Sequence, residues 1–394
     1  MTALKNPLIW QLLFGTVFLL LIAIDVPWLR AIVPLLALAA WGYVIWRLLR
    51  ERRVLRQVQP SQPIDRSVQA IPTIRGAIDV TDDGPAIDID EMQAYLSSRL
   101  IGQDVAAAQI ARGIYRRTAQ QRRDKPVFTA LFSGPTGTGK TEMAKAIADY
   151  LYGSERSLFR VDCGNVLGEA GLQTLVGSPK GYAGSGSWGA LTAHLRTMPK
   201  SVLLFDEIEK AVTSPQSPMA KLLLSLLDEG LCTEQSDGTK VSAKDAVILL
   251  TSNAAHDKLG AIAAQFGDQP DELVRATKDA LRDYFAPEFL ARIDLVTSFA
   301  PLDEQARAKI VALHTARIGK TYGVEVAGLD ASFANEALRR WATLEGYGTR
   351  EVIRWIEEAV ADQLIQAKRD NVERVEIGLV EGDVEIRPLA RAAT

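Results

Sequence analysis

The chain has 394 residues, of which 47% are hydrophobic and 24% are charged. This mixture can bury a large core and excludes an intrinsically disordered protein. Lys and Arg number 45 against 48 Asp and Glu, so the net charge of −3 lacks the basic excess of many nucleic-acid-binding proteins. Only two cysteines, Cys163 and Cys232, are present, which excludes a disulfide framework and argues against a zinc site.

Two apolar runs occupy the start of the chain. Residues 8–24 carry no charge, and the second run, 28–46, is continuously apolar from Ala31 onward. At 1.5 Å per residue each run reaches roughly 25 Å, slightly less than a hydrocarbon core of ~30 Å, and flanking tryptophans could complete each span at the interface. We therefore predict a transmembrane helical hairpin within residues 1–56 that contacts membrane lipid through residues 8–46.

Positive charges predict the orientation of this hairpin. Lys5 precedes the first run, and a cluster of arginines follows the second: Arg47, Arg50, Arg52, Arg53 and Arg56. Both ends should face the cytoplasm, most simply at a bacterial inner membrane. Two alternatives are a cleaved signal peptide, because Ala37-Leu38-Ala39 resembles a cleavage site, and a soluble hairpin buried by the remaining chain. The first would be cleaved beyond a second apolar run, and the second needs polar stripes that neither run has.

The part that follows the hairpin divides into a linker and an alternating α/β region. Residues 57–88 contain four prolines and no sustained period, which predicts a linker. A helical pattern begins near Ile89. Helical stretches then alternate with four strand-like apolar runs: Phe128–Phe132, Leu158–Val161, Ser201–Phe205 and Ala246–Leu250. The alternation predicts a parallel sheet with helices on both faces, in a large domain of residues 89–300.

A change of pattern near Pro301 predicts a second, smaller domain over residues 301–394. Residues Leu302–Ile318 and Thr349–Lys368 have amphipathic helical periodicity. Arg374–Leu379 and Asp383–Arg387 are expected to form a closing β pair.

A phosphate-binding loop lies between the first strand-like run and a helical stretch that starts at Glu142. The pattern G-x-x-x-x-G-K-[ST] is met by Gly134, Pro135, Thr136, Gly137, Thr138, Gly139, Lys140 and Thr141. Glycines allow successive backbone N–H groups to point at phosphate oxygens, and the helix N-terminus adds positive charge. Lys140 would reach the β- and γ-phosphates, and Thr141 would hold Mg²⁺. The loop therefore predicts ATP and Mg²⁺ as cofactors.

A pair of acids follows the third strand-like run, Ser201–Phe205. Asp206 is expected to bind Mg²⁺ through water, and Glu207 to act as the general base that polarises the attacking water. An acidic strand end alone is weak evidence, but together with the upstream phosphate loop it predicts ATP hydrolysis.

Several further segments, together with these two motifs, resemble the Clp-type AAA+ unfoldases, above all the second ATPase module of ClpB. In chain order they are Leu100-Ile101-Gly102-Gln103-Asp104, Gly177-Ser178-Pro179-Lys180-Gly181-Tyr182-Ala183-Gly184, Asp206-Glu207-Ile208-Glu209-Lys210-Ala211, Leu250-Thr251-Ser252-Asn253, Pro287-Glu288-Phe289-Leu290-Ala291-Arg292-Ile293-Asp294 and Gly348-Thr349-Arg350. The resemblance covers about residues 89–390. It implies a P-loop AAA+ large domain followed by a small, mostly helical lid domain.

The resemblance also implies roles for individual residues. Ile101 and Gly102 would lie beside the adenine, and Gly181, Tyr182 and Ala183 would form a pore loop whose tyrosine grips the substrate. Asn253 would orient the attacking water. Arg292 would act as an arginine finger on a neighbouring subunit's nucleotide, and Arg350 as a second sensor. These roles imply a homohexameric ring that unfolds, threads or remodels polypeptides.

Two departures from the family pattern bear on partners. The chain has one phosphate loop, whereas ClpB has two ATPase modules, and the hairpin stands where ClpB has its N-terminal domain. The segment 253–270 also lacks the Ile-Gly-Leu or Ile-Gly-Phe tripeptide that docks a peptidase, so we expect no ClpP-type partner.

Two functions other than threading use the same nucleotide residues. One is an ATP-dependent switch or assembly factor for a membrane protein complex. The other is a nucleic-acid translocase, which a slightly acidic chain with only Lys180 beside Tyr182 does not favour, so no nucleic-acid partner is expected.

Overall fold

The computed structural model describes residues 87–120, 124–181, 186–266, 269–343, 349–380 and 382–389. Residues 8–46, on which the membrane hairpin is predicted, and 57–86 of the predicted linker lie outside these ranges. Across the described ranges, no helix is both long and apolar enough to cross a membrane. The hairpin therefore stays a prediction from sequence.

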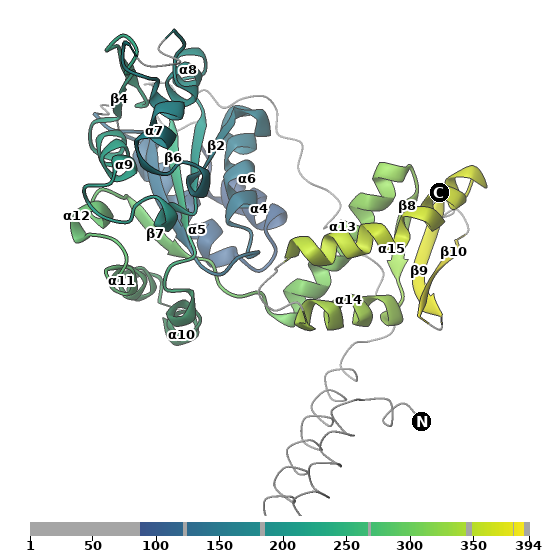
Figure 1. The fold of residues 1–394 in the computed structure, drawn as a ribbon. Coiled ribbons are helices and arrows are strands. Elements are labelled where there is room, and N and C mark those ends of the chain that lie inside the picture. The colour runs from purple at the N-terminus through teal and green to yellow at the C-terminus, as the bar shows by residue number, and fades with distance from the viewer. Residues whose placement is uncertain are drawn as a thin grey trace, which may run out of the picture. The chain divides into compact units, whose positions relative to one another are not determined.

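A five-stranded parallel sheet forms the centre of the larger part of the described chain (Figure 1), with the strand order β2-β3-β6-β1-β7. Its strands are β1 Phe128–Ser133, β2 Leu158–Asp162, β3 Val202–Asp206, β6 Val247–Ser252 and β7 Leu295–Ser298. The first four coincide with the predicted strand-like runs to within one or two residues at each end. No comparable signal in the sequence marks β7, because half of its four residues are polar.

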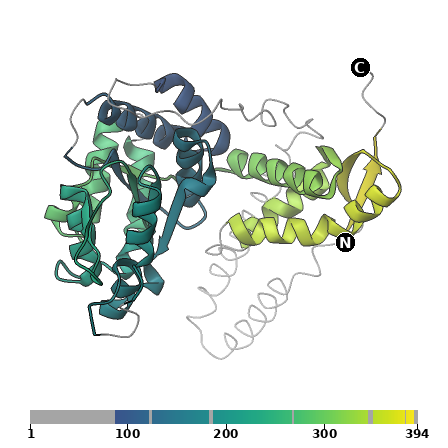
Figure 2. The same cartoon turned by 90° about the horizontal axis from the view of Figure 1, so that it is seen from above.

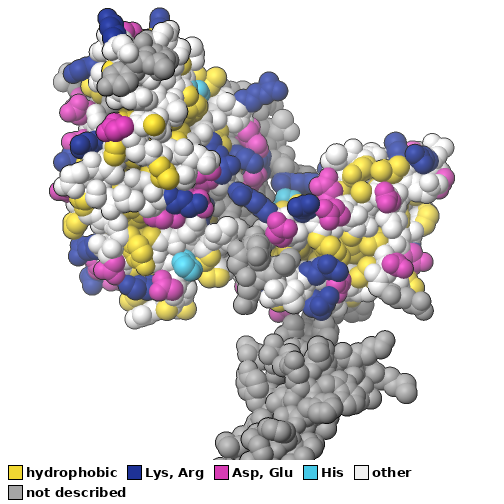
Figure 3. All heavy atoms as spheres, in the orientation of Figure 1, with side chains coloured by type: hydrophobic (Ala, Val, Ile, Leu, Met, Phe, Trp, Pro, Cys, Tyr) yellow, Lys and Arg dark blue, Asp and Glu magenta, His cyan; other side chains and the backbone are white. Residues whose placement is uncertain are grey.

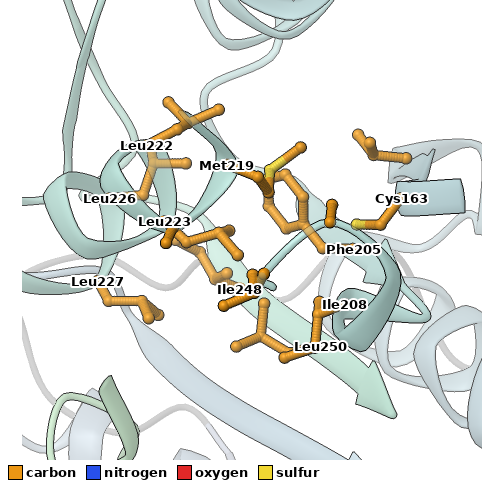
Figure 4. Close-up of a cluster of buried hydrophobic side chains, with 14 of the residues drawn as sticks. Cys163, Phe205, Ile208, Met219, Leu222, Leu223, Leu226, Leu227, Ile248 and Leu250 are labelled. Atoms are coloured by element: carbon orange, nitrogen blue, oxygen red, sulfur yellow. The ribbon is translucent and has the colours of Figure 1, made fainter. Parts of the chain in front are cut away.

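Each face of this sheet has its own hydrophobic core, because alternate side chains of a strand point to opposite faces. On one face Phe205, Ile248 and Leu250 pack against leucines of α9, as Figure 4 shows. On the other face Leu204 and Leu249 join the apolar sides of α4, α5 and α6. Unbroken apolar runs are what a strand covered on both faces requires.

The helices that come between the predicted linker and β7 in the sequence surround the sheet (Figure 1). They are α4 Ile89–Arg99, α5 Asp104–Thr118, α6 Lys140–Tyr152, α7 Gly168–Val176, α8 Ala190–Thr197, α9 Pro218–Glu229, α10 His256–Phe266, α11 Pro270–Leu281 and α12 Pro287–Leu290, with short 3₁₀ turns η2 Glu155–Ser157, η3 Cys163–Asn165 and η4 Ile208–Lys210. The start of α4 confirms the helical pattern at Ile89: the Asp88 side chain caps it by accepting hydrogen bonds from Asp90 N and Glu91 N. A small antiparallel hairpin, β4 Leu231–Thr233 and β5 Lys240–Ser242, follows α9.

The C-terminal elements pack around a third core (Figures 1 and 2). They are α13 Glu304–Tyr322, β8 Glu325–Leu329, α14 Ala331–Thr343, α15 Thr349–Arg369, β9 Arg374–Val380 and β10 Asp383–Pro388. The two amphipathic helices and the closing β pair are thus confirmed. Strand β8 extends the pair to a three-stranded sheet, β10-β9-β8, in which β8 and β9 run parallel. The division into domains at residue 300 remains a prediction.

Candidate nucleotide site

The phosphate loop joins the end of β1 to the start of α6, as its sequence pattern requires. Gly134, Gly137 and Gly139 have φ angles of 155°, 80° and 100°, which side-chain-bearing residues rarely adopt. A Cβ atom on Gly134 would lie 2.4 Å from the carbonyl oxygen of Phe299, just beyond β7. The loop therefore lies close against the end of the neighbouring strand, and only glycine fits there.

Lys140 lies at the first turn of α6 with its ammonium group turned toward the loop. Its Nζ donates to the carbonyl oxygens of Gly134 (2.6 Å) and Pro135 (2.9 Å) and to Oδ1 of Asn253 (2.8 Å). Burial lowers the pKa of Lys140 to about 8, even though nearby carboxylates draw it upward. A buried cation at the mouth of a glycine-rich loop is suited to the phosphates of a nucleotide.

The two acids at the end of β3 are organised by a hydroxyl of the adjacent strand β6. Thr251 donates a short hydrogen bond to Asp206 Oδ1 and accepts one from the Glu207 backbone N–H at 3.0 Å. Asp206 is also paired with Arg160, whose Nη2 lies 2.6 Å from Oδ2. Glu207 has a φ of 57°, unusual for a residue with a side chain. The Thr251 hydroxyl therefore helps hold Glu207 in a strained conformation of the kind that clusters at functional sites.

Asn253 connects the lysine to the acids. Its Oδ1 accepts from Lys140, and its Nδ2 donates to Glu207 Oε1 at 3.2 Å. Glu207 also accepts a short hydrogen bond from Lys210, and Asn253 N donates to Glu209 Oε1 at 3.1 Å. Three residues predicted separately, Lys140, Glu207 and Asn253, thus form one hydrogen-bonded chain at the carboxyl ends of β1, β3 and β6. Ligand sites of open parallel sheets lie at this edge.

Mg²⁺ fits the oxygen donors present here. Asp206, the last residue of β3, is 7% exposed, and Thr141 directly follows Lys140 in α6. Mg²⁺ binds through one or two protein oxygens together with substrate phosphates, and it does not need a cage of side chains. No cluster of three or more His, Cys, Asp or Glu that could hold a metal occurs in the described part of the chain.

The segment predicted beside the adenine is held by backbone contacts. Gly102 has a φ of 78°, and a Cβ there would lie 3.0 Å from that of Ala306. The adjacent Gln103 uses both atoms of its amide on the Ala300 backbone, at 2.9 and 3.2 Å. These contacts hold Ile101 and Gly102 close to residues 300–306, where α13 begins. Their contact with adenine remains a prediction.

Two predicted arginines lie apart from this hydrogen-bonded chain. Arg292, just after α12, forms an ion pair with Asp228 at the end of α9. Arg350 is exposed in the first turn of α15, whereas its neighbour Thr349 donates to the carbonyl oxygen of Gly137 at 2.6 Å. Their roles as arginine finger and second sensor stay predictions.

The predicted pore loop is described only in part. Gly181 is exposed with a φ of 94°, while Tyr182 and Ala183 lie outside the described residues. Gly348, the first residue of the predicted second-sensor segment, also lies outside the described residues.

The motifs alone did not indicate four further residues of the site: Arg160, Thr251, Glu209 and Lys210. Three of them lie inside the quoted segments, so their position next to Glu207 or Asn253 was a usable signal. Arg160 belongs to no recognised motif. It is near Asp206 only because β2 lies next to β3 in the sheet.

The cysteines serve the core and not this site, while one histidine lies at the edge of the site: His256 Nδ1 is 3.1 Å from the backbone carbonyl oxygen of Asn253. Burial raises the pKa of the Cys163 and Cys232 thiols to about 12 in each case, so both are protonated packing residues at neutral pH. His194 stacks on Phe159 with ring centroids 4.6 Å apart.

Comparison with known proteins agrees with this geometry. Residues 125–296 match the family model described as "AAA domain (Cdc48 subfamily)". Together with the parallel sheet, the phosphate loop after β1 and the acids at the end of β3, this match gives the class: the region is an AAA+ P-loop ATPase module. AAA+ ATPases of the ClpB type use ATP with Mg²⁺.

Similarity over a longer stretch gives the family. The chain is 34% identical over 308 residues to the ATP-dependent Clp protease ATP-binding subunit ClpE of Bacillus subtilis (strain 168), which covers 76% of this chain and 43% of that protein. It is 36% identical over 307 residues to the chaperone protein ClpB of Streptomyces albus G, covering 75% and 34% respectively. The chain belongs to the Clp/ClpB-type AAA+ family.

A solved structure supports the same assignment. The closed state of Hsp104 with ATPγS and FITC casein superposes with a TM-score of 0.61 at 27% identity, over 76% of this chain and 51% of that one. The chain spans less than half of the length of ClpE and about a third of that of ClpB.

Proposed function

We propose that this chain hydrolyses ATP at sites shared between subunits of a homohexameric ring, and that hydrolysis drives the unfolding, threading or remodelling of polypeptides at a membrane. The observation that carries the proposal is the hydrogen-bonded chain Lys140–Asn253–Glu207, which links the phosphate loop to the expected general base.

The geometry supports a route from ATP binding to hydrolysis. The loop N–H groups and Lys140 would bind the β- and γ-phosphates, while Thr141 and Asp206 would hold Mg²⁺, the latter through water. A phosphate that attracts Lys140 competes with the Asn253 amide oxygen for the same ammonium group. Asn253 would then be free to orient the attacking water, which Glu207 polarises as general base.

The ring is proposed from Arg292. This residue is tied to Asp228 at the end of α9 and not to the acids of its own chain's site. An arginine finger supplied in trans stabilises the charge that develops during phosphoryl transfer. A site completed by a neighbouring subunit requires assembly.

Polypeptide is the proposed substrate, and Tyr182 the residue that grips it. The solved Hsp104 structure contains casein, a protein. An aromatic ring contacts backbone and side chains of almost any sequence, which suits an unselective grip. On the one face that Figure 3 draws, the coloured basic and acidic side chains lie interspersed, so that face shows no continuous basic track for a nucleic acid.

Membrane anchorage by residues 8–46 and the lack of a ClpP-type peptidase belong to the proposal as well. The anchor rests on the two apolar runs and their arginine flank. The expectation that no ClpP-type peptidase binds rests on the segment 253–270, which carries no docking tripeptide. Alkaline carbonate extraction of bacterial inner membranes tests the anchor, because a peripheral protein would be released and a spanning one retained.

Replacing Tyr182 with Ala tests the threading function. The purified full chain should keep its ATPase rate within about twofold, because the proposal gives Tyr182 no role in hydrolysis, and lose most of its ability to unfold a tailed green fluorescent protein. Tyr284→Ala, at an exposed tyrosine after α11, is the matched control and should change neither rate. If Tyr182→Ala unfolds the substrate at the wild-type rate, the chain acts as an ATP-dependent switch and threading is wrong.

A further inference from the structure

A buried carboxylate lies outside the nucleotide site, just after strand β4. Glu234 is 0% exposed and accepts hydrogen bonds from Gly189 N and Ser236 N, each at 3.0 Å, and a short one from the Thr192 hydroxyl. Burial alone would raise its pKa, but these hydrogen bonds lower the pKa below its usual value. Glu234 is therefore a charged group satisfied entirely by uncharged donors, which is costly to bury without purpose.

Glu234 closes the neck of the segment that carries Tyr182. A Cβ on Gly177 would lie 1.7 Å from Glu234 Oε1, and one on Gly189 would lie 2.3 Å from both Gly177 N and Leu175 O. The two ends of the segment 177–189 thus touch each other, and the carboxylate binds one end while lying against the other. Glycine at both ends allows this approach.

Two further contacts join the same neck to the β4–β5 hairpin, and a third steadies Trp188 from helix α8. Gln235 N donates to the carbonyl oxygen of Val176 at 2.7 Å, and the Trp188 side chain hydrogen-bonds Asp237 at the hairpin turn. The guanidinium of Arg196 lies 4.6 Å from the centre of the Trp188 ring. Both ends of the segment are therefore fastened to one hairpin.

The chain connects each of these pieces to the acids of the nucleotide site. The segment 177–189 leads through α8 into β3, which ends at Asp206 and Glu207. The hairpin is reached from Glu207 through η4 and α9. At Glu234 these two segments of chain, one before and one after Glu207, come into contact.

We propose that Glu234 is a positioning residue that fastens the segment 177–189 to the β4–β5 hairpin, so that the Tyr182 loop and the hairpin move as one unit when the nucleotide changes. The inference rests on the proposed threading function. A carboxylate suits the role because it offers only acceptors to several donors; a glutamine would turn its NH₂ group toward one of them.

Glu234→Gln tests the proposal in the purified full chain. The ATPase rate without substrate should stay within about twofold, because the hydrogen bonds of Glu234 go to the loop and the hairpin. Unfolding of tailed green fluorescent protein should fall roughly tenfold, so that the ATP consumed per molecule unfolded rises by the same factor. Glu234→Asp keeps the charge and should recover part of the loss. Glu229→Gln, at an exposed acid ending α9, is the matched control.

A second variant separates coupling from folding. Thr192→Val removes one donor to Glu234 at nearly constant volume and should raise the ATP cost per unfolded molecule about threefold, even if Glu234→Gln lowers the melting temperature too far for assay. The proposal is overturned if these variants keep the wild-type ATP cost, or if they lose ATPase and unfolding in equal proportion. Tyr182→Ala shows which of the two proposals has failed. If Tyr182→Ala unfolds the substrate at the wild-type rate, the threading function is wrong. If Tyr182→Ala loses unfolding activity while the Glu234 and Thr192 variants keep it, only the role of Glu234 is wrong.

Discussion

At the scale of single residues, the hydroxyl of Thr251 holds both acids of the nucleotide site. It donates to Asp206 and accepts from the backbone of Glu207, and it is 0% exposed. Because buried polar groups left without partners are costly, loss of this one hydroxyl would affect both acids at once.

Thr251→Val should therefore impair the site. Valine keeps the shape but leaves the Glu207 N–H and one oxygen of Asp206 without partners, which costs about 1–3 kcal/mol of folding free energy. We expect ATP turnover to fall roughly tenfold to hundredfold, because Glu207, the proposed general base, and Asp206, proposed to hold Mg²⁺ through water, would lose their alignment. The measurement is steady-state ATPase alongside urea denaturation.

Thr315→Val provides the control. Thr315 is also fully buried, but it donates to Val311 within α13. It should lose stability without a comparable loss of turnover. Equal turnover in the two variants would show that Thr251 does not organise the acids.

The residues of the site that could be predicted are those inside a recognisable pattern. Lys140, Asp206 and Glu207 belong to motifs whose chemistry fixes their identity. Glu234 could not be found in this way, because its importance comes from burial among specific donors. In the sequence, Glu234 resembles an ordinary acid near a hairpin turn.

At the scale of elements, the same contrast holds for strands. β1, β3 and β6 are covered on both faces and show continuous apolar runs, so they could be predicted. β7 and β8 could not: β7 has only four residues, and β8 contains Gly328 at an irregular step of its pairing with β9. Their positions are set by packing against neighbours, which a local pattern does not record.

Helix α13 is expected to give the protein a measurable pH dependence. Burial, reinforced by Arg317 and opposed by Glu142, lowers the pKa of His314 to about 4. The unfolded chain binds a proton near its ordinary value of about 6.5, whereas the folded chain does not. Stability contributed by neutral His314 is thus complete above pH 6.5 and is lost as the pH falls toward 4.

Urea denaturation at pH 8 and pH 5 measures this effect. The free energy of unfolding should drop by about 2 kcal/mol from this group at pH 5. His314→Gln should remove that part of the drop, whereas His256→Gln, at an exposed histidine, should not. An unchanged pH dependence in His314→Gln would contradict the assignment.

At the scale of the whole molecule, each nucleotide site is proposed to be completed by a neighbouring subunit. Glu207 is proposed to act on the nucleotide of its own chain, and Arg292 on that of a neighbouring subunit. Two inactive variants could then restore activity to each other within one ring, which is impossible for an ATPase whose site lies in a single subunit.

Complementation between two inactive variants tests that claim most directly. Glu207→Gln and Arg292→Ala should each be inactive alone, but subunits mixed before assembly should recover roughly a quarter of wild-type ATPase, because a random neighbour restores the missing arginine at that fraction of sites. As a control, Glu207→Gln mixed with Lys140→Ala should recover nothing, since every site then lacks a residue of its own chain. If the first mixture stays as inactive as its components, the nucleotide site is not shared between subunits and the account is wrong.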